Sequence, residues 1–294
     1  MKGPEFLRQR VGVVKSRMGG FVPGSHVAIR GRDLHETFRR SEWADLFFFA
    51  NTGRRFSSAQ LRLLQSLWTY SSYPDVRLWP NRIAGLAGTA RSTANLGLAA
   101  AHASCEATIF GRGPDRRAST FLRETLEAVN HGGSIAECVR KELDIHRGIA
   151  GYGRPLVSKD ERIEPTLNLA RELGLDKGPH LRLAFEIDDY LSKGRWRMHI
   201  NQAAVAAALA ADIGLTPEEY YVCGFPAFLA GMVPCYLEAL EQPEGALFPI
   251  PCEDIAYDGI GPRRWNDRHT KGGEEAQSAS PAATNGNNAA GGHS

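Results

Sequence analysis

The stretch NQAAVAAALAADIGLTPEEY, residues 201–220, contains one complete helix signal and the start of another. Its first part is rich in alanine and other good helix formers, and Gly214 follows as a typical helix stop. Thr216 then supplies an N-cap, Pro217 suits the first helical position, and two glutamates occupy the first turn. These features predict two consecutive helices joined by a short turn.

Similar signals extend along most of the chain. Apolar residues at helical spacing, with residues typical of helix ends, predict further helices over 34–49 (in two pieces broken at Ser41), 58–68, 81–109, 119–129, 134–145 and 164–173. No alternating pattern typical of a strand exceeds a few residues. The sequence therefore predicts an all-α protein.

Composition predicts how the chain divides. Residues 115–195 are richer in charge and glycine than their surroundings, which suggests a small domain set between two parts of a large one, 25–114 and 196–262. Residues 1–24 would be an N-terminal extension. Residues 263–294 contain so few large apolar side chains that we expect a disordered tail.

Charge and cysteine content restrict the class of protein. Lys plus Arg is 35 and Asp plus Glu is 33, so the net charge of +2 gives no electrostatic reason to expect nucleic acid. The five cysteines form no C-x-x-C pair and no metal-ligand spacing, so we expect no metal site. The chain has no signal-peptide pattern and no apolar run long enough to span a bilayer. We expect a cytoplasmic protein that does not associate with membranes.

Six segments, in order along the chain, resemble motifs of the citrate synthase superfamily. They are VAIRGRDLHE (27–36), WADLFFFANTGRRFSSAQ (43–60), GRGPDRRAS (111–119), IAGYGRPLVSKDERI (149–163), MHINQAAVAAALAADIGL (198–215) and FPIPCEDIAYDG (248–259). The resemblance is strongest to the shorter citryl-CoA lyase members and to the lyase module of ATP-citrate lyase. The fourth segment is similar to the most recognisable motif of the superfamily, Gly-Phe-Gly-His-Pro followed by Asp-Pro-Arg.

The resemblance implies a helical homodimer with an active-site cleft between a large and a small domain. Members of the superfamily form or cleave a carbon–carbon bond between a CoA thioester and a keto acid, or hydrolyse citryl-CoA. The expected ligands are therefore an acyl-CoA, as substrate, and a keto or hydroxy acid. No permanently bound cofactor is expected.

The motif positions that carry proton transfer in the superfamily hold other residues in this chain. Arg116 falls at the enol-stabilising histidine, Arg154 at the histidine of the keto acid, and Asn201 at the catalytic aspartate. An arginine stays protonated at neutral pH, and an asparagine is neutral, so neither can cycle a proton. Each lost acid–base group typically removes about a hundredfold to ten-thousandfold in rate. The superfamily's substrate-binding arginine also falls near Ala227, so ordinary citrate synthesis is not expected.

These replacements leave other chemistry open. Arg116 and Arg154 would stabilise negative charge that develops on an enolate or carboxylate, and Asn201 would orient the substrate. His199 is the nearest replacement base, or else an ordinary surface or packing histidine. His131, in NHGGS, resembles the enol-histidine motif, but it leaves too few residues before Gly151 for the intervening helices. A turn with a glycine stop is the alternative for His131.

The residues that match the CoA-binding segment of the superfamily are better preserved than those at the catalytic positions. Gly151, Gly153 and Pro155 suit a close backbone approach to a ligand, and Lys159 and Arg162 match a basic pair that contacts CoA phosphate in relatives. A solvated charged loop is the alternative for that pair.

Three functional interpretations remain open at this point. The first is a divergent enzyme that acts on a CoA thioester, by condensation, cleavage or hydrolysis. The second is a non-catalytic protein that binds an acyl-CoA or a carboxylate, or that partners a catalytic paralogue. The third is conventional activity, with the catalytic residues at positions shifted from those assigned above.

Overall fold

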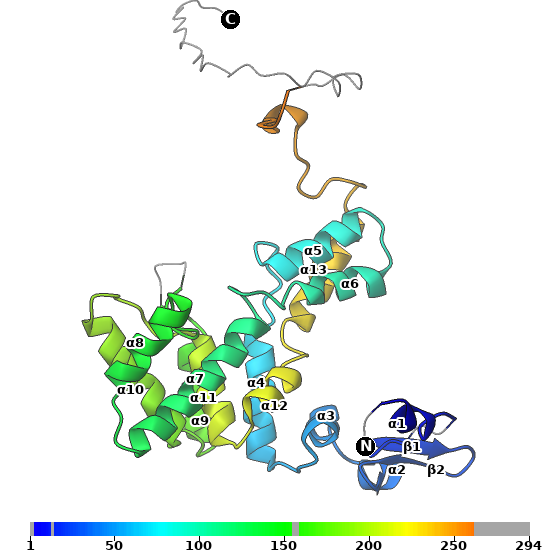
Figure 1. The fold of residues 1–294 in the computed structure, drawn as a ribbon. Coiled ribbons are helices and arrows are strands. Elements are labelled where there is room, and N and C mark those ends of the chain that lie inside the picture. The colour runs from blue at the N-terminus through cyan, green and yellow to red at the C-terminus, as the bar shows by residue number, and fades with distance from the viewer. Residues whose placement is uncertain (1–2, 13–14, 155–158, 262–294) are drawn as a thin grey trace, which may run out of the picture. The chain divides into compact units, whose positions relative to one another are not determined.

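The computed structural model describes residues 3–12, 15–154 and 159–261, and the statements below refer to these residues. They form two compact units, one up to Pro249 and one from Ile250. The second contains a short 3-10 turn, Cys252–Asp254. The helices of the first unit are α1 (Pro4–Arg8), α2 (Leu34–Thr37), α3 (Trp43–Thr52), α4 (Ser58–Ser71), α5 (Trp79–Thr89), α6 (Ala94–Ala103), α7 (Arg112–Asn130), α8 (Ile135–His146), α9 (Ile163–Glu172), α10 (Pro179–Lys193), α11 (Gln202–Asp212), α12 (Pro217–Cys223) and α13 (Leu229–Glu241), labelled where room allows in Figure 1.

The predicted all-α class is confirmed, with one addition. A small antiparallel sheet of β1 (Gly19–Val22), β2 (His26–Ile29) and β3 (Arg32–Asp33) lies near the N-terminus, where no strand was predicted. The residues of β1 are all exposed, so no buried–exposed alternation marked them in the sequence. The sheet turns at Arg30 and Gly31, both in the left-handed region. The Arg30 side chain then donates hydrogen bonds to the carbonyls of Ala50 (2.8 Å) and Asn51 (3.0 Å) near the end of α3.

Helix α11 is central to the main core. Its residues from Ala204 to Ala211 are all buried, and it packs against α7 and α10. The small alanine side chains let these helices approach closely. Larger side chains from the neighbours, among them Leu122, Ile187 and Leu191, fill the remaining space. Burial of this kind, more than intrinsic helix propensity, stabilises the arrangement.

A second, smaller core joins α5, α6 and α13. Gly88 of α5 allows the close approach, because a Cβ there would lie 2.5 Å from the carbonyl oxygen of Tyr236 in α13.

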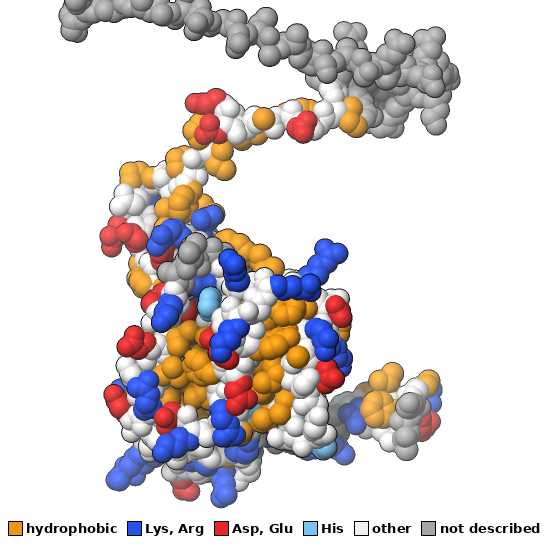
Figure 2. Space-filling model, turned by 90° about the vertical axis from the view of Figure 1, so that its left-hand side faces the viewer, with side chains coloured by type: hydrophobic (Ala, Val, Ile, Leu, Met, Phe, Trp, Pro, Cys, Tyr) orange, Lys and Arg blue, Asp and Glu red, His pale blue; other side chains and the backbone are white. Residues whose placement is uncertain are grey.

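Figure 2 shows one face of the molecule, on which basic, acidic and apolar side chains are interspersed. Among the described helices, none is long and apolar enough to cross a membrane. The domain boundaries near 115 and 195 stay predictions, and the predicted tail, 263–294, lies outside the described residues.

Candidate functional site

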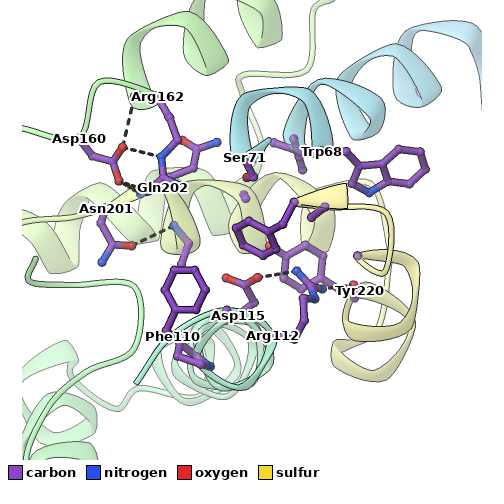
Figure 3. A pocket seen from close by; sticks show the side chains of 18 of the residues that line it. Trp68, Ser71, Phe110, Arg112, Asp115, Asp160, Arg162, Asn201, Gln202 and Tyr220 are labelled. Carbon is purple, nitrogen blue, oxygen red and sulfur yellow. Dashed lines mark hydrogen bonds and ion pairs between the residues drawn. The ribbon is translucent and has the colours of Figure 1, made fainter. Parts of the chain in front are cut away.

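A pocket of about 350 Å³ lies between α4, the start of α7, the residues before α9, the start of α11, and α12. Its wall includes apolar side chains such as Phe48, Leu64 and Trp68. Its polar lining includes Arg112, Asp115, Arg154, Asp160, Arg162 and Asn201, most of which Figure 3 labels. Apolar walls with a few converging polar groups are typical of small-molecule sites.

The first turn of α7 supplies Arg112 and Asp115, which form an ion pair through Nη1 and Oδ2. The Arg112 side chain is only 8% exposed. Its Nη2 atom also donates to the carbonyl oxygens of Tyr220 (2.8 Å) and Tyr221 (3.0 Å) in α12. Burial raises the pKa of Asp115, while the positive charges of Arg112 and Arg162 oppose that rise.

Asp160 lies before α9 and is fully engaged. The Arg162 guanidinium donates to both of its oxygens, at 2.8 and 2.7 Å, and the backbone N–H of Gln202 donates at 2.9 Å. Burial alone would raise the pKa of Asp160, but the hydrogen bond and charge of Arg162 outweigh it and lower that pKa. The pair therefore fixes the segment before α9 to the first residue of α11.

Arg154 takes part in a network at the pocket rim. It donates to Glu161 Oε2 (2.7 Å) and to the carbonyl oxygen of Lys159 (3.0 Å). The Tyr73 hydroxyl donates to Glu161 Oε1 at 2.9 Å. The hydrogen bond from Arg154 lowers the pKa of Glu161 to about 2, and burial with the Glu161 contact raises the pKa of Tyr73 to about 12.

Asn201 caps α11 and holds the glycine-rich loop. Its Oδ1 accepts from the N–H of Ala203 (2.9 Å), and its Nδ2 donates to the Gly153 carbonyl oxygen (2.7 Å). The backbone N–H of Asn201 donates to the Gly151 carbonyl oxygen (2.9 Å), and the N–H of Gly153 donates to the His199 carbonyl oxygen (2.7 Å). Asn201 is therefore oriented by the backbone on both sides.

The pocket brings together four of the residues that the sequence singled out: Gly153, Arg154, Arg162 and Asn201. Gly151 lies behind them, with φ +88° and packed on Ala204. Pro155 lies outside the described residues.

Arg116, which the sequence predicts to stabilise negative charge, does not line this pocket. It is 53% exposed and pairs with Glu218 at 3.1 Å on the surface. The arginine of the same motif that lines the pocket is Arg112, one helical turn earlier in α7. The motif alone did not give the residue at which the helix begins.

His199, Lys159 and His131 also lie outside the pocket lining. All three are exposed. The ring of His199 faces Asp188, with 3.8 Å between Nδ1 and Oδ1, and His131 follows the last residue of α7. Within the described ranges, no cluster of three His, Cys, Asp or Glu side chains is arranged to hold a metal ion.

Sequence reasoning missed Arg112, Asp115 and Tyr220 as pocket residues. The first two lie in the quoted segment GRGPDRRAS, at the i, i+3 spacing of an ion pair within a helix. The spacing of these two opposite charges is the signal that the sequence contains, whereas their burial follows from the packing of α7.

Comparison with solved structures identifies the fold. The structure is similar to citryl-CoA lyase from Hydrogenobacter thermophilus, with a TM-score of 0.74 and 20% identity, covering 86% of this chain and 97% of that one. It is similar to ATP citrate lyase from Methanothrix soehngenii in complex with citrate and coenzyme A (TM-score 0.67, 15% identity, 88% of this chain, 45% of that one). A third similar structure is citrate synthase from Thermoplasma acidophilum with carboxymethyl coenzyme A and oxaloacetate (TM-score 0.60, 16% identity, 76% of this chain, 59% of that one).

The sequence matches no protein-family model, and no curated protein matches it. The chain spans nearly the whole of the citryl-CoA lyase, at 97%, and less than two thirds of the other two proteins, at 45% and 59%. The chain has the fold of these citryl-CoA lyase, ATP citrate lyase and citrate synthase structures, as the six motifs predicted.

Proposed function

We propose that this pocket binds the acyl end of a CoA thioester, and that the chain is a divergent citrate-synthase-like enzyme. The reaction would form or cleave a carbon–carbon bond, or hydrolyse the thioester, without the usual two histidines and aspartate. The observation that carries the proposal is that Arg112, Arg154 and Arg162 line one cavity in this fold. Arg112 and Arg162 are each paired with a lining aspartate, and Arg154 with Glu161, so a ligand that carries or develops negative charge would replace one of these partners.

The volume of the cavity indicates which part of the ligand it holds. About 350 Å³ is at the lower end of the range of small-molecule sites, which suits an acyl group and a short carboxylic acid. The rest of CoA would lie outside, where Lys159 is exposed near the rim. Gly151 and Gly153, both at positive φ, keep this backbone free of side chains.

Arg154 is the arginine best placed to engage an incoming anion. The side chain of Arg154 is 20% exposed and that of its partner Glu161 is 55% exposed, so Glu161 can turn into solvent when a ligand binds. A ligand carboxylate or enolate oxygen would then replace Glu161 as the partner of Arg154. Asn201 would orient the substrate, and Arg112 takes the stabilising role that the sequence assigned to Arg116.

Turnover assays test this proposal. We expect wild-type protein to release free CoA from at least one acyl-CoA or citryl-CoA substrate, or to consume acetyl-CoA with a keto acid. Arg154→Ala should remove that activity, whereas the control Arg182→Ala, an exposed arginine of α10, should not. Activity that is equal in the two variants would contradict the role of Arg154.

A second function is favoured by a specific observation. No histidine is among the described residues that line the pocket, so the two histidines of the usual mechanism have no counterpart in that lining. A non-catalytic protein that binds an acyl-CoA or carboxylate, or that partners a catalytic paralogue, accounts for this as well. Binding without turnover on any substrate would select this alternative.

We also propose a homodimer. Four large apolar side chains of α5, α6 and α13 are exposed in the single chain: Leu86 (40%), Leu96 (70%), Val233 (39%) and Leu237 (52%). Contiguous exposed apolar patches are typical of association surfaces, and these side chains would form part of one. Analytical ultracentrifugation should give twice the chain mass, and Leu237→Asp should shift the protein toward monomer. A wild-type monomer at all concentrations would refute the proposal.

A further inference from the structure

The titratable groups of the pocket differ in their availability for proton transfer. Of the described lining residues, two are carboxylates, Asp115 and Asp160. Burial raises the pKa of Tyr73 and of Cys223 to about 12, and it raises the pKa of Tyr220 as well, which keeps all three protonated at neutral pH. The arginines are permanently protonated. A proton acceptor in this pocket is therefore one of the two aspartates.

The carboxylate of Asp160 already accepts hydrogen bonds at both of its oxygens. Oδ1 accepts from the backbone N–H and Nε of Arg162, and Oδ2 accepts from Arg162 Nη2 and the N–H of Gln202. Its side chain is 1% exposed. A carboxylate held in this way is a weak base, and protonating it would disrupt the start of α11.

Asp115 is bound on one side only. Its Oδ2 accepts from Arg112, whereas Oδ1 accepts no hydrogen bond from any residue that the structure describes. The side chain is 15% exposed and lies in the pocket lining, where Figure 3 shows its carboxylate between Phe110 and Arg112. Arg112 holds the carboxylate in place, and the charges of Arg112 and Arg162 favour its ionised form, but burial outweighs them and raises the pKa of Asp115, which makes the carboxylate more basic.

We propose that Asp115 is the catalytic base of this pocket and removes the proton from the carbon next to the thioester carbonyl. The inference rests on the proposed function and names the group that replaces the missing aspartate. In this step the Cα–H bond breaks and the proton passes to Oδ1 of Asp115. The electron pair of that bond forms a carbon–carbon double bond, and the negative charge moves to the thioester oxygen. A pocket arginine stabilises that oxygen, and return of the proton reverses the step.

Deuterium exchange tests this step alone. We would incubate the protein with acetyl-CoA and propionyl-CoA in D₂O and follow loss of the α-proton signal by NMR. Wild-type protein should catalyse exchange, and Asp115→Asn should reduce the rate about a hundredfold or more. Asp115→Glu keeps a carboxylate and should retain part of the rate. Asp144→Asn, an exposed aspartate of α8, is the control and should exchange like wild type.

A pH profile covers the case in which Asp115→Asn fails to fold. The wild-type exchange rate should rise with pH through one ionisation and then level off, and Asp115→Glu should move the midpoint. The groups whose charge interacts with Asp115 are Arg112, Arg162, Tyr220 and Cys105, and none of them ionises in that range. His102 titrates nearby, but its interaction is with Arg112. A midpoint that stays fixed in Asp115→Glu would overturn the proposal.

These experiments also distinguish a failure of the role of Asp115 from a failure of the proposed function. Acyl-CoA binding without exchange by wild-type protein would overturn the role of Asp115 and leave the proposed function standing. Undiminished exchange in a folded Asp115→Asn variant would do the same. Absence of binding to any acyl-CoA would overturn both.

Discussion

The guanidinium group of Arg112 occupies the space in which a side chain on Gly224 would stand. A Cβ built at Gly224 would lie 1.9 Å from Nη2 of Arg112. Gly224 follows α12 directly, so the absence of a side chain there lets the buried arginine reach the carbonyl oxygens of Tyr220 and Tyr221. A glycine at the end of one helix thus sets the position of a charge in the pocket.

Gly224→Ala should displace Arg112 and lower the free energy of unfolding by about 1–3 kcal/mol, since buried hydrogen bonds of a charged group are lost. Gly148→Ala is the matched control, because no atom lies within 4 Å of its Cβ position. Chemical denaturation of both variants makes the comparison. Equal stability of the two would show that Arg112 relaxes without loss.

Gly151→Ala should disturb the loop that carries Arg154. Its φ is +88°, and a new Cβ would lie 2.9 Å from the backbone nitrogen of Ala204. Gly174→Ala is the control, because Gly174 has φ +69° with open space around it, so it bears only the cost of the left-handed conformation, about 1 kcal/mol. We expect Gly151→Ala to lose clearly more stability than Gly174→Ala in thermal unfolding. Similar losses would mean that the clash is absorbed.

Asp160→Ala should be among the most destabilising changes near the site. It leaves the Arg162 guanidinium without its partner and removes the acceptor for Gln202, at an expected cost of about 3 kcal/mol. Asp189→Ala, an exposed ion-pair residue of α10, should cost less than about 1 kcal/mol. Denaturant midpoints measure both values, and a small loss in Asp160→Ala would contradict the anchoring role.

Stability should fall at acid pH through the same groups. The folded state lowers the pKa of Asp160, and it lowers the pKa of Glu161 to about 2. A lowered carboxyl pKa contributes stability above its unfolded value, about 4, and that contribution is lost as pH falls through the folded value. Unfolding free energies between pH 2 and 7 should therefore decline below about pH 4, and less steeply in Asp160→Asn. An identical acid slope in that variant would exclude Asp160 as a source.

The helical fold could be predicted from the sequence because its signals are local. The cap predicted at Thr216 makes its hydrogen bond, and the stop at Gly214 is observed. Ser57 and Ser134 cap their helices in the same way. Helix α13 was missed because Gly231 and Pro234 interrupt its pattern. Gly231 packs on the backbone of Tyr73, a contact between distant parts of the chain that local propensity does not encode.

The candidate site was predicted only in part. Arg154, Arg162 and Asn201 line the pocket because the glycine-rich loop and Asp160 hydrogen-bond to the residues at the start of α11. That Arg112 and Asp115 line the pocket, and Arg116 does not, depends on where α7 begins and on its packing against α12. Both are features of the tertiary structure, and the sequence indicated only the segment in which Arg112 and Asp115 lie.

The most direct test of the central claim is isothermal titration of the purified protein with CoA, acetyl-CoA and a panel of short acyl-CoAs. The account predicts binding on the order of micromolar Kd to at least one thioester, weakened about tenfold or more in Arg154→Ala and unchanged in Arg182→Ala. The absence of binding to every member of the panel would contradict the account, and would mean that the chain shares only the fold of these enzymes.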